Sequence, residues 1–383
     1  MAKKKIAILT QPIKANYGGI IQNYGLSEFL KKHGYQVKTI NRVEKNPNSK
    51  LKILSSNFKR YFVSYFIKKN ALNPTKERKI FKNQSNFIQN HIDLTSKIDN
   101  SFTLKNHFKK EHYDTVIVGS DQTWRPKYSP NIYNYFLDFL KDNNQITKLA
   151  YATSFGNSDW EFSEEETKHC AKLVQQFDAV SVREESAVEM TARYLNKDSV
   201  WVVDPTMLLE KSDYLKLIDK RRQPQRKGIY SYILDETSAI RNFIEQAQDI
   251  LQMAHFTNQP KVRDKSKTSK KLSDYKYPAL EGWLQGFEEA DFVITNSFHG
   301  TVFCVIFNKP FITIVNKERG ASRFYSLLGK LNLDSRIIET TSLSKKQMED
   351  TIHQKVDFTH ANQTLKEMKK ESVEFLLKAL EKN

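Results

Sequence analysis

His299 stands where a strand-like run gives way to a second apolar stretch, in the segment ITNSFHGTVF at residues 294–303. An imidazole has its ordinary pKa near neutral pH, so a histidine at the end of a strand is a candidate general acid. Gly300, which follows it, leaves the backbone open to a ligand, and the start of a helix there favours an anion. The alternative is a structural histidine that caps the helix or bonds to its own loop.

Arg183 lies in the segment SVREES and is a candidate anion clamp. A guanidinium group can hold a phosphate or a carboxylate at two points, which a lysine cannot do. The alternative is a weak ion pair with Glu184 or Glu185.

The segment GSDQTW supplies groups that are typical of a sugar site, because an aromatic face stacks on pyranose C–H bonds while polar groups bind the hydroxyls. Asp121 is a candidate base for a hydroxyl proton, and Ser120, Gln122 and Trp124 are candidate acceptor contacts. Asp121 can instead be a turn or cap residue, and Trp124 a core or hinge anchor. Asn16, Gln22 and Asn23 are further candidates for contact with the acceptor sugar. The alternative is that their side chains only hydrogen-bond to the backbone of their loop.

The sequence has no HxH, HExxH or clustered carboxylates, and no glycine-rich dinucleotide or nucleoside triphosphate loop. Its two cysteines, Cys170 and Cys304, are too few for a disulfide framework. We therefore expect neither a metal nor a cofactor.

A formal net charge of +17 over 383 residues favours an anionic partner: a phosphorylated substrate, a membrane surface or nucleic acid. No zinc-finger, RNP-like or helix-turn-helix pattern supports nucleic acid, which we do not expect as a partner. A pair of basic, aromatic helices is predicted from about 57 to 91; they can rest on anionic lipid or form an ordinary amphipathic insertion. Without a signal or membrane-spanning segment, we expect a cytoplasmic protein, with peripheral contact at the inner face of the membrane left open.

Apolar strand patterns alternate with helical patterns along the chain, which predicts parallel sheets covered by helices. We expect two Rossmann-like α/β domains facing across a cleft, with the C-terminal helix docking back. The expected N-terminal domain, 1–208, lies on the acceptor side and carries a basic helical insertion at about 45–110; the C-terminal domain is 209–383. Ligands bind beyond the carboxyl ends of parallel strands, where the segments named above lie.

Six segments in register resemble the polysaccharide pyruvyl transferase family over residues 6–335: ANYGGIIQNYGL, DTVIVGSDQTW, AYATSFG, SVREES, VVDPTMLL and TNSFHGTVFCVIFNKPF. The resemblance implies a GT-B-like fold. It also implies transfer of pyruvate from phosphoenolpyruvate, a co-substrate, onto two hydroxyls of one sugar to give a cyclic ketal. Implied acceptors are sugars of cell-envelope polysaccharides such as capsules and exopolysaccharides, often carried on a lipid diphosphate.

In this family context His299 is implied to protonate phosphoenolpyruvate, and Arg183 matches an arginine that contacts the donor. Ser297 departs from the pattern, because many members carry an arginine two positions before the histidine. Arg319 and Arg323 follow the next strand and can replace the missing charge, or they are surface arginines. The candidate donor-binding set is Arg183, Ser297, Gly300, Arg319 and Arg323.

Two other functions remain open: a sugar-nucleotide-dependent glycosyltransferase of the same shape, and a basic scaffold protein on a membrane or nucleic acid. Ligand-induced stabilisation separates them. Phosphoenolpyruvate would stabilise a pyruvyl transferase, a UDP- or GDP-sugar would stabilise a glycosyltransferase, and neither would stabilise a scaffold.

Overall fold

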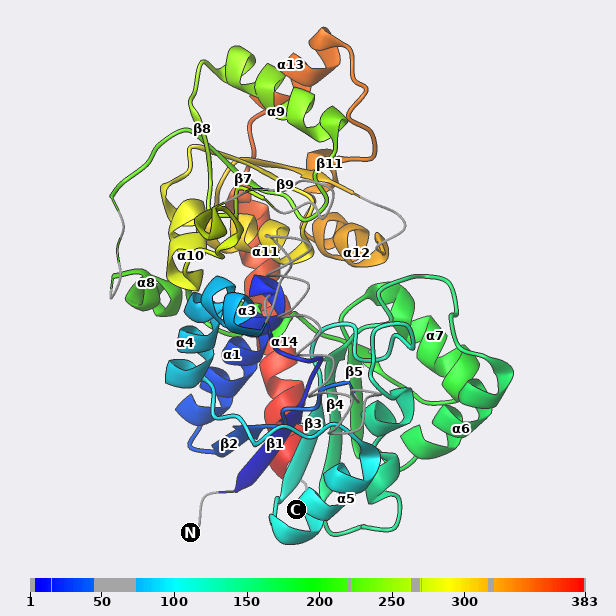
Figure 1. Ribbon diagram of the computed structural model, residues 1–383. Helices are drawn as coiled ribbons and strands as arrows, with labels where there is room; N and C mark the ends of the chain where they lie inside the picture. Colours follow the sequence, from blue (N-terminus) through cyan, green and yellow to red (C-terminus); the bar gives the residue numbers. More distant parts are fainter. Residues whose placement is uncertain are drawn as a thin grey trace.

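Two parallel β-sheets, each flanked by helices, form the two halves of the computed structural model (Figure 1). The structure describes residues 4–381 except 15, 45–73, 220, 221, 223, 263–268, 270 and 316–319. The predicted fold of two α/β domains is confirmed.

The first sheet has six strands in the order β2-β1-β3-β4-β5-β6, all parallel. Its strands are β1 (Lys5–Leu9), β2 (Gln36–Thr39), β3 (Thr115–Val118), β4 (Thr147–Thr153), β5 (Ala179–Val182) and β6 (Val200–Trp201). Strands β3 and β4 are buried along their whole length, as expected of parallel strands covered on both faces.

The second sheet has five parallel strands in the order β11-β10-β9-β7-β8. These strands are β7 (Ile229–Tyr232), β8 (His255–Thr257), β9 (Phe292–Thr295), β10 (Phe311–Ile314) and β11 (Ile337–Ile338). The chain therefore changes sheets between Trp201 and Ile229; the exact domain boundary at 208/209 stays a prediction.

The predicted helices at about 163–177, 184–195, 237–252 and 300–307 form close to those bounds, as α6, α7, α9 and α11. The helices around the first sheet are α1 (Tyr17–Lys32), α5 (Ser101–Lys110), α6 (Glu164–Val174) and α7 (Glu185–Leu195). Those of the second half are α8 (Lys211–Asp219), α9 (Ser238–Leu251), α10 (Leu280–Glu289), α11 (Phe298–Phe307), α12 (Ser322–Lys330) and α13 (Lys345–His353). Short 3-10 helices include η2 (Ile132–Phe136) and η4 (Pro205–Met207).

The predicted basic helical pair is described only from residue 74 onward, as α3 (Pro74–Ile80) and α4 (Lys82–His91); the rest lies outside the described residues. Phe87 of α4 is buried, with its ring centre 5.7 Å from that of Tyr24 in α1. Gln84 donates a 2.8 Å hydrogen bond to the carbonyl of Pro278 in the second half. The buried face of α4 thus contacts both halves of the chain.

A continuous apolar core joins the two halves on the α1 side. The ring of Tyr17, the first residue of α1, stacks on Trp283 of α10 at 5.5 Å between centres. Its hydroxyl donates a 2.7 Å hydrogen bond to the carbonyl of Pro278. The start of α1 is therefore held firmly against the second half.

The C-terminal helix α14 (Phe358–Glu381) returns to the first sheet, so the predicted docking is confirmed (Figure 1). The hydroxyl of Ser372 accepts a 3.0 Å hydrogen bond from the amide of Val203, and Leu376 is fully buried. The carbonyl of Leu380 accepts a 2.8 Å bond from the Lys4 ammonium. Among the described residues, no helix is long and apolar enough to span a bilayer.

Candidate active site

A cavity of about 360 Å³ lies where the carboxyl ends of strands from both sheets face each other. Asn16, Asp121 and Gln122 line it from the first half, and Ser297, His299 and Arg323 line it from the second. Residues separated by more than a hundred positions thus share one site.

Asp204 is the buried carboxylate at the base of this site. Its Oδ2 lies 2.8 Å from Nη1 of Arg183 and 3.5 Å from Nε2 of His299. Its Oδ1 accepts hydrogen bonds from the Thr206 amide and hydroxyl, at 3.0 and 2.7 Å. Burial would raise the pKa of the Asp204 carboxyl, but His299, Arg183 and the Thr206 amide hold it well below its usual range. Asp204 therefore remains a carboxylate that orients both neighbours.

His299 bridges the two halves. It is the second residue of α11, and its side chain is almost completely buried. Its Nε2 faces Asp204, while Nδ1 faces the start of α1, so closely that a Cβ added to Gly18 would lie 2.2 Å from Nδ1. Only a glycine at position 18 leaves room for the ring, whose orientation is fixed from both sides.

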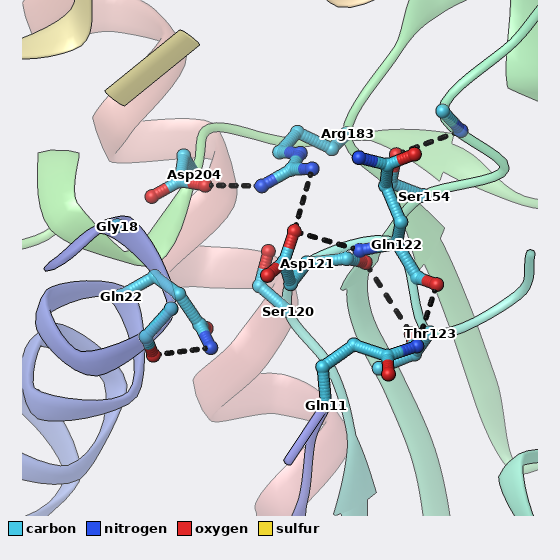
Figure 2. A network of polar contacts seen from close by, with 12 residues as sticks. Gln11, Gly18, Gln22, Ser120, Asp121, Gln122, Thr123, Ser154, Arg183 and Asp204 are labelled. Atoms are coloured by element: carbon cyan, nitrogen blue, oxygen red, sulfur yellow. Dashed lines mark hydrogen bonds and ion pairs between the residues drawn. The ribbon is translucent and has the colours of Figure 1, made fainter. Parts of the chain in front are cut away.

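Arg183 is buried among carboxylates, as Figure 2 shows for Asp204 and Asp121. Its Nη2 lies 3.6 Å from Oδ1 of Asp121. Burial lowers the pKa of Arg183, but Asp204, Glu184 and Asp121 outweigh this effect and raise it. Nε and Nη2 have no hydrogen-bond partner among the described residues. Arg183 does not itself line the cavity, and its direct partner is Asp204 rather than the neighbouring glutamates of the sequence.

Arg323, in the first turn of α12, brings a second guanidinium group to the site. Its central carbon lies 5.4 Å from the ring centre of Phe298, over which Arg183 also lies, at 4.9 Å. Burial, and then the charge of Arg183, lower the pKa of Arg323 to about 10, so it stays charged at neutral pH. Its Nε has no hydrogen-bond partner in the part of the chain that the structure describes. Arg319, the other candidate, lies outside the described residues.

Two helix N-termini also face the cavity. Ser297 caps α11, where its hydroxyl accepts a 3.4 Å hydrogen bond from the Gly300 amide. Asn16 caps α1, where its Oδ1 accepts a 3.0 Å bond from the Gly18 amide. Helix N-termini carry partial positive charge, so both ends favour a bound anion.

The loop after β3 presents Asp121 and Gln122 to the cavity (Figure 2). Asp121 has a left-handed backbone, with φ of 72°, and its Oδ1 accepts a 2.9 Å hydrogen bond from the Gln122 amide. Oε1 of Gln122 accepts a 2.9 Å bond from Arg125, which Glu161 holds with two bonds of 2.7 Å. The predicted turn role of Asp121 and its place in the site are therefore compatible.

Trp124 does not line this cavity, which corrects the expected sugar contact. It is fully buried in the core of the first half, its ring stacked on Phe136 at 4.8 Å between centres. Its Nε1 donates a 3.0 Å hydrogen bond to the carbonyl of Tyr135. Because core side chains occupy the space around the indole, no sugar can stack on it.

Ser120 and Gln22 are also buried behind the cavity wall and not on it. The Ser120 hydroxyl donates a 2.8 Å hydrogen bond to the carbonyl of Ala152. Nε2 of Gln22 donates a 2.9 Å bond to the hydroxyl of Thr10. Both side chains support the loops that carry the site, which corrects their expected direct contact with the acceptor.

The structure also corrects the expected contacts of Asn23 with the acceptor and of Gly300 with the donor. Oδ1 of the buried Asn23 accepts a 3.0 Å hydrogen bond from the Thr39 hydroxyl. A Cβ at Gly300 would lie 2.3 Å from the Thr295 hydroxyl oxygen, so this glycine makes room for a neighbouring side chain and not for a ligand.

Asp204, Gly18 and Tyr128 were not among the sequence candidates, although the structure places them at the site. Asp204 follows the edge strand β6 in the segment VVDP, so its position after a strand was an available signal. The approach of Gly18 to His299 had no local signal, because the two residues meet only when the halves pack together.

Among the described residues, no group of three histidine, cysteine or carboxylate side chains is placed to hold a metal ion.

The chain matches the family model described as polysaccharide pyruvyl transferase over residues 16–318. Comparison with curated proteins finds no significant match.

Solved structures of the same overall shape include a glycosyltransferase from Rickettsia africae ESF-5, with 10% identity, full coverage of both chains and a TM-score of 0.55. Arabidopsis thaliana UGT89C1 complexed with UDP-L-rhamnose is 10% identical over 97% of this chain and 95% of its own, with a TM-score of 0.53. The UDP-N-acetylglucosamine 2-epimerase from Rickettsia bellii is 13% identical over 98% and 97%, with a TM-score of 0.50. These matches show that the fold is GT-B-like.

Proposed function

The chain belongs to the polysaccharide pyruvyl transferase family, and we propose that it transfers a pyruvyl group from phosphoenolpyruvate to two hydroxyls of one sugar, forming a cyclic ketal. The acceptor sugar belongs to a cell-surface polysaccharide or to its lipid-linked precursor. The observation that carries this proposal is a cavity lined by His299 and Arg323, with Asp204 and Arg183 buried beside it and nitrogens without a hydrogen-bond partner on both arginines.

The donor site of this proposal lies between Arg183 and Arg323. Phosphoenolpyruvate carries a phosphate and a carboxylate, which match two guanidinium groups better than one. Arg323 lies over Phe298, the neighbour of Ser297, so it brings a cation to the region where Ser297 lacks one. The N-termini of α1 and α11 add further donors for the same anion.

In the proposed reaction, His299 gives its proton to the methylene carbon of phosphoenolpyruvate, leaving a cation at the adjacent carbon. One sugar hydroxyl adds to that carbon and loses its proton to Asp121. Phosphate then leaves with the electron pair of its C–O bond, and the second hydroxyl adds in its place. Asp121 passes the first hydroxyl proton to the departing phosphate, and the proton of the second hydroxyl restores His299, so the reaction balances without an oxidant or a cofactor.

Asp204 is a positioning residue in this scheme. Its carboxylate lies 3.5 Å from Nε2 of His299, the Nδ1 side of the ring packs against Gly18 at the start of α1, and His299 lines the cavity. The acceptor would enter along Asn16, Asp121 and Gln122, which line the cavity from the first half. An acid on one half and a base on the other would thus act on two substrates held between them.

The test is phosphate release from phosphoenolpyruvate with a panel of lipid-linked and free galactosides and N-acetylmannosaminides. We expect release only when a suitable acceptor is present, and release about a hundredfold slower or more from the His299→Ala variant. The second test is thermal unfolding in the presence of phosphoenolpyruvate or of UDP- and GDP-sugars. A ligand at a hundred times its dissociation constant raises the free energy of unfolding by about 2.7 kcal/mol. Stabilisation by a sugar nucleotide and not by phosphoenolpyruvate would overturn the proposal in favour of a glycosyltransferase.

We also propose that the protein works in the cytoplasm and makes peripheral contact with anionic lipid beside α3 and α4. Lys79, Lys82 and Lys276 line one hollow there, formed by both halves of the chain. Each lysine close to an anionic surface contributes about 1 kcal/mol, so three of them give a weak, salt-sensitive attraction.

A further inference from the structure

Tyr128 is an exposed aromatic side chain on the wall of the cavity. It lies on the loop that carries Asp121 and Gln122, and 42% of its surface is exposed. Leu234, from the second half, lines the same cavity and is 37% exposed. Large exposed apolar groups on the wall of a cavity that also carries a carboxylate and amides indicate a ligand with both an apolar face and polar groups.

Arg125 holds the ring of Tyr128 from one side. Its guanidinium carbon lies 4.6 Å from the ring centre. Arg125 is itself 2% exposed and fixed by two hydrogen bonds of 2.7 Å to Glu161. Because this guanidinium covers one face of the ring, the exposed part of Tyr128 lies away from it.

The backbone under Tyr128 is fixed as well. The Tyr128 amide donates a 3.0 Å hydrogen bond to the carbonyl of Arg125. The next residue, Ser129, donates its hydroxyl to the carbonyl of Thr123 at 2.8 Å and accepts a 2.9 Å bond from Nε2 of Gln11. A ring held in place before binding loses little conformational entropy when a ligand covers it.

We infer that Tyr128 is the stacking platform for the pyranose ring of the acceptor, with Leu234 on the opposite wall. A pyranose has an apolar face of C–H bonds and a rim of hydroxyls, which matches an aromatic face beside a carboxylate and an amide. Gln122 and Asp121 lie on the same loop as Tyr128 and supply those polar groups. The inference rests on the proposed function, because it assigns a place to the acceptor of that reaction.

Saturation-transfer NMR with methyl pyranosides of galactose, glucose, mannose and N-acetylmannosamine tests the platform directly, without turnover. The variants are Tyr128→Ala and Tyr128→Phe, and Phe102→Ala is the matched control, because Phe102 is 73% exposed on α5 and does not line the cavity. We expect saturation of ring C–H protons by the unmodified protein, about tenfold weaker binding by Tyr128→Ala, and unchanged binding by the other two variants.

A Tyr128→Ala variant that binds the pyranosides as the unmodified protein does would overturn the inference, and so would a complete absence of pyranoside binding to the unmodified protein. Equal losses in Tyr128→Ala and Phe102→Ala would also overturn it, because they would indicate a nonspecific effect. Stabilisation by phosphoenolpyruvate is measured on the same samples. If phosphoenolpyruvate does not stabilise the unmodified protein, this result counts against the proposed function alone, because pyranoside binding is measured without the donor.

Discussion

Gly18 and His299 come from different halves of the chain and pack in direct contact, with no room for even a methyl group between them. Gly18 lies at the start of α1, which the Tyr17–Trp283 stack holds against the second half. The orientation of the imidazole therefore depends on how the two halves are assembled.

The first prediction is that Gly18→Ala sharply lowers turnover. The added Cβ would overlap the imidazole, so either the ring or the start of α1 must move. Gly19→Ala is the matched control, because a Cβ there comes no closer than 3.7 Å, to Asp121. Steady-state kinetics and thermal unfolding of both variants check this. Full activity of Gly18→Ala would show that the contact does not constrain the histidine.

His299→Ala should lower kcat about a hundredfold or more and leave phosphoenolpyruvate binding largely intact, as expected when a general acid is removed. His299→Gln is a second variant that keeps a polar side chain beside Asp204. Single-turnover kinetics measure the chemical step, and ligand-induced stabilisation measures donor binding. Wild-type turnover in a folded variant would show that His299 has only a structural role.

Arg323→Ala and Arg183→Ala should raise the KM for phosphoenolpyruvate, because an anion clamp acts on the ground state as well as on the transition state. If Arg323 replaces the arginine that Ser297 lacks, then Ser297→Arg should partly restore donor binding to Arg323→Ala but not to Arg183→Ala. Kinetics over a range of phosphoenolpyruvate concentrations give the answer. An unchanged KM in Arg323→Ala would show that this arginine does not bind the donor.

Asp204→Asn should destabilise the protein by about 3 kcal/mol at pH 7, because it breaks a buried ion pair. Folding lowers the pKa of Asp204, so its contribution is complete above the unfolded-state pKa of about 3.9 and is lost as the pH falls below that value. The stability difference from wild type should therefore shrink below about pH 4.

Urea unfolding at pH 7 and pH 3 measures this difference, with Asp249→Asn, an exposed carboxylate on α9, as the control. A difference that does not change with pH would mean that the charge of Asp204 contributes nothing to stability.

Vesicle flotation should recover the protein with anionic vesicles at low salt, and less as salt is added, because salt screens the lysine charges. Replacing Lys79, Lys82 and Lys276 together by glutamine should reduce recovery without affecting turnover of a soluble acceptor. Equal recovery on neutral and anionic vesicles would exclude a charge-driven contact.

The sequence by itself determined the fold class and the strand ends at which Asp121, Arg183 and His299 lie. Alternating apolar patterns are local, and the carboxyl ends of parallel strands meet at one edge of a sheet, so Asp121 and Arg183 were predictable neighbours at the edge of the first sheet, and His299 was predictable at the corresponding edge of the second. The apolar stripe of α14 also predicted that this helix packs against a domain. The stripe did not indicate which of the two sheets the helix packs on.

Only the tertiary structure decided which aromatic residue faces the cavity, which carboxylate holds His299, and why residue 18 is a glycine. Trp124 and Tyr128 lie on one loop, and no periodicity in a loop tells the buried ring from the exposed one. Asp204 and Gly18 reach His299 across distances of about a hundred residues or more in sequence. Such contacts depend on the packing of two separately formed sheets, and local patterns carry no information about that packing.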